Sequence, residues 1–270
     1  MSFCTNYFAI ANQFTPLFNT PKIQETFGGM DGVSLPLQGE LLKELETMIF
    51  PNTPLKILKK HSNYICEVSC HEYPSLFPLF TDIRFLDLLS EPPPKRNIIL
   101  PSVEEIKNTC ISFLGVPYLW GGSSRGIKNM LELYPPHRSP SSLPSLISRT
   151  WSLEGVDCSG LIYYATNGWT PRNTSSLIQY GRAVSIYNKD ISLWDIQPLD
   201  LIVWKGHVIL ILDQNTTIES LGGKGVISYS FKDRIEQIHK EYGRYGVNHW
   251  NQAVSLREDQ RFVIRRWLDG

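Results

Sequence analysis

Hydrophobic and polar positions change their spacing near residue 100, and this change divides the chain into two parts. From about Phe3 to Leu89, short apolar segments are broken by frequent prolines and glycines, a pattern typical of a small barrel-like β module. Residues 53–58 and 62–68 are expected to form two of its strands, whereas residues 41–50 fit a short helix.

A run of three prolines within residues 91–96 marks the boundary between the two parts. Consecutive prolines favour extended polyproline geometry and exclude a helix or a central strand. The pattern therefore predicts a first domain at residues 1–90, a linker at 91–100 and a second domain at 101–270.

The second part begins with helical spacing and ends with β-rich segments. Residues 102–105 have the form of a capping box, and apolar residues between Val103 and Leu114 recur at helical spacing. Later apolar segments, separated by short polar breaks, predict an antiparallel sheet. These segments are residues 201–204, 208–212, 226–231 and 262–264. The second domain is therefore expected to be α+β, with its helices first and its sheet second.

The segment between Gly122 and Trp151 is rich in serine and proline. Its prolines are spaced too closely for regular structure, so the sequence predicts a long surface insertion at about residues 123–153. Because the insertion lies just before Cys158, it could wall or cover a binding cleft; a tolerated loop fits the pattern equally well.

Composition and charge limit the classes of protein. The 270 residues are 42% hydrophobic, which suits two modest globular domains. Lysine plus arginine (26) balances aspartate plus glutamate (26), so neither nucleic acid nor an anionic membrane is expected as a partner. No apolar run approaches the roughly 18 residues of a membrane span. Residues 1–13 lack the features of a secretory signal, and the five cysteines are odd in number, so a reduced, cytoplasmic location is expected.

Cysteines and histidines in the first domain raise the alternative of a metal site. Cys66 and Cys70 are three residues apart, with His61 and His71 nearby. No second ligand pair follows downstream, and residues 64–68 alternate in the manner of a strand. We therefore expect a strand here, with no metal and no cofactor.

Cys158 is the strongest candidate for a reactive side chain. Apolar residues follow it at offsets of three, four and seven, so it begins a helix that Asp157 can cap. The positive end of a helix favours a thiolate, which is the nucleophilic form of cysteine. The alternative is a small buried hydrophobic residue, which is the usual role of a lone cysteine in a helix.

His207 begins a strand in the same domain and could take a proton from the cysteine. A third group would have to orient the imidazole, and Glu219 is the candidate. If residues 213–215 form the hairpin loop, Glu219 pairs opposite Ile209 and shares the face of His207; a two-residue turn would reverse its face. A polar residue at a strand start and a solvated carboxylate remain the alternatives, and His239 is the rival orienting group.

Four ordered motifs resemble those of the NlpC/P60 cysteine peptidases. They are residues 115–122, 156–161, 198–202 and 206–208, and the resemblance covers about residues 101–265. Four motifs in one order are far more specific than any single one. The resemblance implies a papain-like fold for the second domain and no metal.

The first domain resembles a bacterial SH3 domain, chiefly through residues 37–41 and 72–74. The arrangement of the two domains is similar to that of γ-D-glutamyl-L-diamino acid endopeptidases, which recycle cell-wall peptides. This resemblance implies that Cys158 attacks the γ-D-glutamyl carbonyl and that His207 acts first as base and then as acid.

The same resemblance implies a pocket for the free amine of an N-terminal L-alanine. The expected substrate-binding residues are Asp157, Ser159, Tyr73, Glu40 and Thr174. Tyr73 and Glu40 come from the SH3-like domain, and Thr174 follows the catalytic helix with its hydroxyl toward substrate.

The sequence departs from the family pattern at three places. Glu219 stands where the third catalytic residue is usually histidine, and Leu199 replaces the glycine that usually precedes Asp200. The insertion at 123–153 is longer than is usual.

The expected function is that of a cytoplasmic cysteine endopeptidase, which cuts peptidoglycan stem peptides at the γ-D-glutamyl–diaminopimelate bond. Its partner is then a peptide derived from peptidoglycan. The alternatives are an amidase or acyltransferase that uses the same dyad, and a non-catalytic cell-wall-binding protein.

Overall fold

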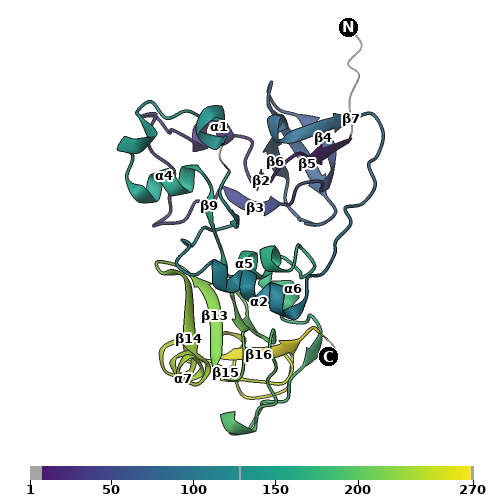
Figure 1. Cartoon of the computed structure of the whole chain (residues 1–270), viewed down its shortest axis with the longest axis vertical. Helices are drawn as coiled ribbons and strands as arrows, with labels where there is room; N and C mark the ends of the chain where they lie inside the picture. Colours follow the sequence, from purple (N-terminus) through teal and green to yellow (C-terminus); the bar gives the residue numbers. More distant parts are fainter. Residues whose placement is uncertain (1–7, 128, 269–270) are drawn as a thin grey trace. The chain divides into compact units, whose positions relative to one another are not determined.

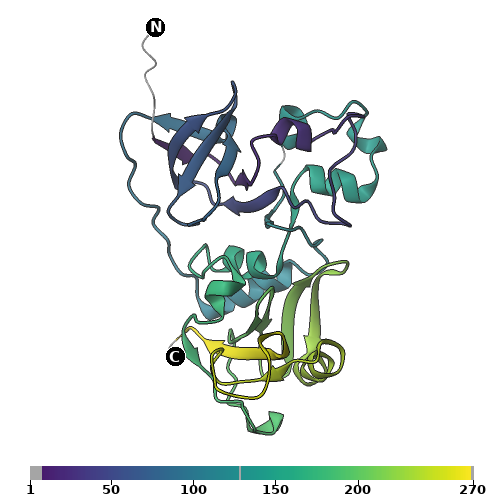
Figure 2. The ribbon, with the colours of Figure 1, turned by 180° about the vertical axis from the view of Figure 1, so that it is seen from behind.

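The computed structural model describes residues 8–127 and 129–268, and these divide into two compact units (Figures 1 and 2). The first unit comprises residues 1–98 and 117–157, and the second comprises residues 99–116 and 158–270. The chain thus passes between the units three times. The sequence predicted one boundary, at residues 91–100, and assigned the segment 117–157 to the second domain.

The first unit is built on a seven-stranded sheet whose neighbouring strands are all antiparallel, in the order β3-β2-β6-β5-β4-β1-β7. The strands are β1 (Phe8–Ala11), β2 (Thr15–Phe18), β3 (Leu45–Ile49), β4 (Pro54–Lys60), β5 (Ile65–Cys70), β6 (Leu79–Asp82) and β7 (Leu86–Leu89). A short helix α1 (Ile23–Thr26) follows β2, and a 3-10 turn η1 (Ile83–Phe85) precedes β7. The predicted strands at 53–58 and 62–68 are confirmed as β4 and β5.

The helix expected at residues 41–50 was wrong, because residues 45–49 form strand β3. Thr47 pairs with Leu17 of β2, and four of the five residues of β3 are buried. Pairing along β2 satisfies the backbone of this segment while its apolar side chains fill the core.

The segment 123–153 was expected to be a surface insertion without regular structure; many of its residues are exposed, but the expected absence of regular structure was wrong. It contains β8 (Ser123–Arg125), α3 (Met130–Leu133), a 3-10 turn η2 (Pro140–Ser142) and α4 (Ser145–Trp151). β8 pairs with β9 (Glu154–Val156). Trp151, Met130 and Leu153 are fully buried in one cluster with residues of the N-terminal segment, such as Phe18 and Phe27. Pro135 and Pro136 follow α3, Pro140 begins η2 and Pro144 immediately precedes α4, so the prolines do not interrupt the helices.

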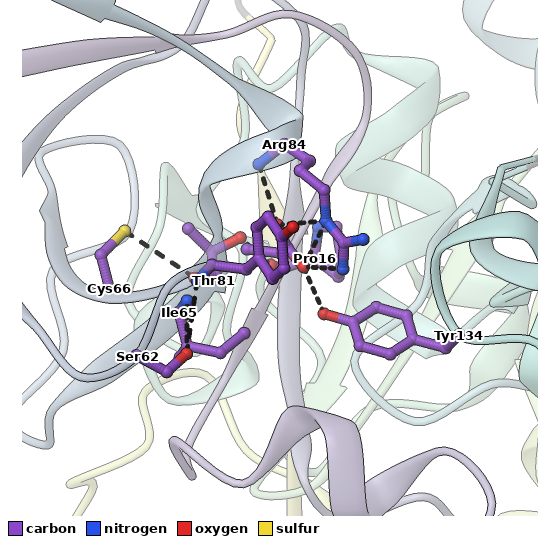
Figure 3. A network of polar contacts seen from close by, with 9 residues as sticks. Pro16, Ser62, Ile65, Cys66, Thr81, Arg84 and Tyr134 are labelled. Carbon is purple, nitrogen blue, oxygen red and sulfur yellow. Dashed lines mark hydrogen bonds and ion pairs between the residues drawn. The ribbon is translucent and has the colours of Figure 1, made fainter.

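A buried polar contact also joins this segment to the N-terminal sheet (Figure 3). The hydroxyl of Tyr134 donates a hydrogen bond of 2.5 Å to Asp82, which is fully buried at the end of β6. Arg84 donates from its side chain and its backbone to the same carboxylate. Burial and the neighbouring Asp82 raise the pKa of Tyr134, which therefore stays a hydrogen-bond donor. The segment is an integral part of the first unit.

The second unit packs helices on an antiparallel sheet with the strand order β10-β16-β11-β12-β13-β14. The strands are β10 (Arg182–Ala183), β11 (Leu201–Trp204), β12 (His207–Ile211), β13 (Thr216–Leu221), β14 (Gly225–Ser230) and β16 (Arg261–Arg266), and β15 (Tyr245–Gly246) pairs with β16 in parallel. The four predicted strand segments are confirmed as β11, β12, β14 and β16. The chain has mixed helices and sheets, as the sequence predicted.

The helices of the second unit are α2 (Val103–Ser112), α5 (Cys158–Ala165), α6 (Thr174–Leu177) and α7 (Phe231–Tyr242), with 3-10 turns η3 (Ile191–Leu193) and η4 (Glu258–Gln260). Helices α2, α5 and α6 precede the sheet, but α7 lies between β14 and β15. The predicted capping box is confirmed at the start of α2, where Ser102 and Glu105 exchange hydrogen bonds. Helix α5 lies between α2 and strands β12 and β13 (Figure 1). Seven of the eight residues of α5 are buried, so its first residue is held firmly against the sheet. Among the described residues, no helix is both long enough and apolar enough to cross a membrane.

Candidate active site

Cys158 is the first residue of α5 and is 5% exposed. Its sulfur lies 4.0 Å from the carbonyl oxygen of Gly206, in the turn that joins β11 to β12. The N-terminus of a helix favours negative charge, so this position suits a thiolate. The predicted helix start is confirmed, and it brings the sulfur to the beginning of β12.

His207 is the first residue of β12, and it contacts both Cys158 and Glu219. Its Nε2 lies 2.6 Å from Oε2 of Glu219, and its ring also interacts with the Cys158 side chain. Since Nε2 is taken by the carboxylate, Nδ1 is the nitrogen that remains for the sulfur. The structure therefore brings the three predicted catalytic residues together within the second unit.

The hairpin register explains why Glu219 reaches His207. Leu210 pairs with Ile218 and Ile211 pairs with Thr217, so Ile209 and Glu219 are the next positions opposite each other. The three-residue loop predicted at 213–215 is confirmed, because Leu212 donates its N–H to Thr216. Residues two apart on a strand share a face, which places Glu219 on the side of His207.

Arg234 of α7 was not expected from the sequence, yet it binds Glu219 with two hydrogen bonds. Its Nε donates to Oε1 at 2.6 Å, and its Nη2 donates to Oε2 at 2.8 Å. Both side chains of this ion pair are fully buried. Arg234 follows Phe231 by three residues and precedes Ile238 by four, so it lies on the buried stripe of the helix. That spacing is the signal by which the sequence could have revealed it.

The electrostatics of the site favour a charged imidazole. Burial alone would lower the pKa of His207, but its interactions with Cys158 and Glu219 raise it to about 9. Burial opposes ionisation of Glu219 as well, yet His207 and Arg234 lower the pKa of its carboxyl. The ionised carboxylate accepts the N–H of Nε2. An imidazolium at His207 is one member of the thiolate–imidazolium pair that acyl transfer by cysteine requires.

Residues around the dyad hold the β11–β12 turn in place. Trp204 pairs directly with His207 across the turn, and their ring centroids lie 5.0 Å apart. The hydroxyl oxygen of Thr174, at the start of α6, accepts the N–H of Gly206 at 3.1 Å. Thr174 thus supports the residue that precedes His207.

The structure places Ser159 in a buried polar contact. Its hydroxyl oxygen accepts a hydrogen bond of 2.8 Å from Nη1 of Arg172, and both side chains are buried. No role was assigned to Arg172 from the sequence. Its guanidinium fixes the hydroxyl one residue after the candidate nucleophile.

In the first unit, the candidate amine-binding residues form a chain of contacts. Oδ2 of Asp157 accepts the N–H of Gly121 at 3.0 Å. Gly121 adopts a φ of 72° and lies so close to β3 that a Cβ would stand 2.7 Å from the Leu45 carbonyl oxygen. The adjacent residue, Glu46, accepts a 2.7 Å hydrogen bond from the Tyr73 hydroxyl.

Glu40 is exposed in the turn between Gln38 and Leu41. The carboxylate that Tyr73 contacts is therefore that of Glu46, whereas the sequence reasoning chose Glu40. Strand β3 turns alternate side chains to opposite faces, and this alternation distinguishes Glu46 from its buried neighbours.

In the described part of the chain, His239, the rival orienting group, makes no hydrogen bond to His207. Its ring stacks on Tyr245 and Phe262, and burial lowers its pKa. Among the described residues, Glu219 is the carboxylate that lies within hydrogen-bond distance of His207.

The Cys66 and Cys70 thiols lie within strand β5, as the alternation predicted. Burial raises the pKa of Cys66 to about 12 and that of Cys70 to about 11, so neither is ionised near neutral pH. Across residues 8–127 and 129–268, no three side chains of histidine, cysteine, aspartate or glutamate gather in a way that could hold a metal ion.

Leu199, which stands where the family resemblance leads one to expect glycine, adopts a φ of 68°. This left-handed conformation is the one that glycine adopts without strain. Leu199 is nevertheless buried, and its backbone N–H donates to Ile211. Leu199 thus keeps the left-handed backbone conformation that suits glycine and adds a buried apolar side chain.

Residues 115–244 match the model of the NlpC/P60 family. The chain therefore contains an NlpC/P60 family domain; proteins of this family are typically cell-wall peptidases, and some members are non-catalytic. The matched range includes Cys158, His207 and Glu219. A search of curated proteins found no match.

Solved structures of NlpC/P60 proteins resemble the chain at low sequence identity. An NlpC/P60 family protein from Bacillus cereus ATCC 10987 is 18% identical, with 98% of this chain and 64% of that chain covered and a TM-score of 0.37. NlpC1 from Trichomonas vaginalis is 15% identical, with 83% and 64% covered and a TM-score of 0.33. RipD from Mycobacterium tuberculosis, described as a non-catalytic NlpC/p60 domain protein adapted to peptidoglycan binding, is 21% identical, with 50% and 88% covered and a TM-score of 0.31. This chain thus spans less than two thirds of the length of the first two.

Proposed function

We propose that the protein is a cytoplasmic cysteine endopeptidase that hydrolyses the γ-D-glutamyl–diaminopimelate bond of peptidoglycan stem peptides. The main support for the proposal is that the buried side chains of Cys158, His207 and Glu219 lie together in the second unit, with Nε2 of the imidazole 2.6 Å from the carboxylate. A thiol, an imidazole and an orienting carboxylate are the groups that acyl transfer by cysteine needs.

The thiolate of Cys158 attacks the γ-carbonyl carbon of the D-glutamyl residue and forms a tetrahedral intermediate. The protonated His207 then gives its proton to the nitrogen of the diamino acid, and the C–N bond breaks. An acyl-enzyme thioester remains. Neutral His207 next takes a proton from water, whose oxygen attacks the thioester, and the thiol is regenerated as the dipeptide leaves. Glu219 keeps the imidazole oriented throughout.

The free amine of an N-terminal L-alanine is the feature that would select the substrate. An ammonium group requires acidic partners, and the first unit offers Asp157 together with the Tyr73–Glu46 pair. We propose Glu46 for this role in place of Glu40. We also propose that the seven-stranded sheet of the first unit is an SH3-like module, which its short antiparallel strands support.

Incubation with the tripeptide L-Ala-γ-D-Glu-diaminopimelate tests the proposal. Release of L-Ala-D-Glu by the wild-type protein, and none by Cys158→Ala, is the expected result. Equal release by both proteins, or by neither, would contradict it.

A non-catalytic protein and an amidase or acyltransferase are the competing functions. Slow labelling of Cys158 by iodoacetamide near pH 6 would favour a non-catalytic binding protein, because an ordinary thiol is protonated there. An amidase should accept an intact glycan strand and a blocked amine, whereas the proposed endopeptidase should accept neither.

A further inference from the structure

We propose that Arg234 is a positioning residue for this site, which holds the carboxylate of Glu219 in the geometry and charge that His207 requires. The inference rests on the proposed function, since it concerns the same dyad. It adds a fourth member to the site, contributed by a helix that no sequence motif marks.

One atom, Oε2 of Glu219, takes part in both ion pairs, that with His207 and that with Arg234. Oε2 of Glu219 lies 2.6 Å from Nε2 of His207 and 2.8 Å from Nη2 of Arg234. Oε1 is occupied by Nε of the same guanidinium at 2.6 Å. Two parallel N–H donors fix both oxygens, so the carboxylate cannot rotate away from the imidazole.

The guanidinium is itself held on several sides. Its Nη1 donates to Oε1 of Gln237 at 2.8 Å, and its carbon lies 5.2 Å and 5.4 Å from the ring centroids of Tyr229 and Tyr242. These contacts come from β14 and from α7. Arg234 is fully buried, so it has little freedom to adopt another rotamer.

The charge of Arg234 determines whether the Glu219 carboxyl accepts a hydrogen bond from Nε2 of His207 or donates one to it. A buried carboxyl without a cation favours its neutral form, and a neutral carboxyl would donate its proton to Nε2. The imidazole would then carry its own proton on Nδ1 and could not accept one from Cys158. Arginine does not lose its proton in proteins, so it keeps Glu219 an acceptor at every pH of interest.

The four side chains form a neutral set when the site is active. Thiolate and carboxylate carry two negative charges, and imidazolium and guanidinium carry two positive ones. In the described part of the chain, the titratable groups that face the Glu219–Arg234 pair are His207 on β12, Tyr229 on β14, Tyr242 on α7 and Lys224 in the turn between β13 and β14. A histidine as third residue would need no such counter-charge. Arg234 thus explains how this chain carries a carboxylate there.

The pH dependence of Cys158 alkylation by iodoacetamide, followed by peptide mass, tests the proposal. This reaction needs no substrate, so it can fail or succeed apart from the proposed function. In Arg234→Met, the acid midpoint of alkylation is expected to rise by a pH unit or more, which makes labelling about tenfold slower at pH 6. In Arg234→Met/Glu219→Gln, the rise should be no larger than in Glu219→Gln alone, because the two residues act as one unit.

A matched control is the buried pair of Arg266 and Asp200, in which a guanidinium also binds both carboxylate oxygens. Arg266→Met should weaken folding but leave the alkylation midpoint of the folded protein unchanged. Arg234→Lys keeps the positive charge but loses the two parallel N–H donors of the guanidinium, so its alkylation midpoint should be intermediate. This variant replaces Arg234→Met in the test if Arg234→Met fails to fold.

The role of Arg234 would be overturned if Arg234→Met or Arg234→Lys had the same alkylation midpoint as the wild-type protein. Additive shifts of the midpoint in the double variant would also overturn it. A wild-type protein whose Cys158 titrates like an ordinary thiol would instead count against the proposed function, while the effect of Arg234 on the midpoint would still be measured.

Discussion

Nε2 of His207 and Oε2 of Glu219 lie 2.6 Å apart across the β12–β13 hairpin, and this contact sets the protonation of the site. The imidazole is buried, which by itself would remove its charge. The interactions with Glu219 and Cys158 outweigh burial and raise the pKa of His207 to about 9. The imidazolium is therefore available as a general acid through the neutral range.

In Glu219→Gln, the alkaline limit of the pH range of activity is expected to move to lower pH. Glutamine lacks the negative charge that holds the proton on His207, so the pKa of the imidazole falls. In the wild-type protein, the alkaline limb of kcat/KM is expected near pH 9. A profile of kcat/KM against pH for the two proteins checks this. Identical alkaline midpoints would show that another group sets the limb.

The same raised pKa links stability to pH. A raised pKa in the folded state gives stability that is complete below the usual pKa of 6.5 and is lost as pH rises to about 9. The difference in unfolding free energy between the wild type and Glu219→Gln should thus be constant between pH 4.5 and 6.5 and shrink above that range, while below pH 4.5 protonation of the Glu219 carboxyl, whose pKa is lowered in the folded state, also reduces it. Urea unfolding at a series of pH values measures this difference, and a constant difference up to pH 10 would contradict the linkage.

Local patterns in the sequence predicted the parts of the site that depend on neighbours along the chain. The capping box at Ser102 depends on residues three apart, and the position of Glu219 depends on a three-residue loop and an alternation of two. Both predictions are confirmed by the structure. Such features can be predicted from the sequence because the interacting residues belong to one helix or one hairpin.

The contribution of residues 123–153 could not be predicted in the same way. Their buried side chains pack against partners about a hundred residues earlier, such as Phe27 against Trp151. Proline spacing describes only the local backbone, so it indicated a surface loop. Arg234 was missed because an arginine in an amphipathic helix usually faces solvent, and only its place on the apolar stripe of α7 signals burial.

Replacement of Trp151 is expected to destabilise the first unit strongly. Trp151 is fully buried, contacts Phe27 and donates from Nε1 to the Tyr134 carbonyl oxygen. Trp151→Ala should cost about 3–5 kcal/mol of unfolding free energy, as large core truncations do. Leu146→Ala in the same helix is the control, since Leu146 is 41% exposed and should cost well under half as much. Equal small losses in urea unfolding would show that the segment is a surface loop after all.

Thr174 is expected to affect turnover through the turn that carries His207. Its hydroxyl oxygen accepts the N–H of Gly206, so Thr174→Val leaves that donor without its partner. A lost hydrogen bond of about 1 kcal/mol corresponds to roughly a fivefold lower kcat/KM. Thr174→Ser keeps the hydroxyl and should restore the rate, and Ser175→Ala, on an exposed position of α6, should have no effect. A wild-type rate in Thr174→Val would exclude this support.

Glu46 and Glu40 can be distinguished by their effects on KM for the free-amine tripeptide. If the Tyr73–Glu46 pair receives the ammonium group, Glu46→Gln removes a charge from that contact and should raise KM about tenfold or more, with a smaller change in kcat. Glu40→Gln is the matched control, because Glu40 lies exposed in a turn and should leave KM unchanged. An N-acetylated tripeptide carries no ammonium group, so the two variants and the wild type should cleave it equally poorly. A rise in KM for Glu40→Gln alone would return the role to the residue that the motif indicated.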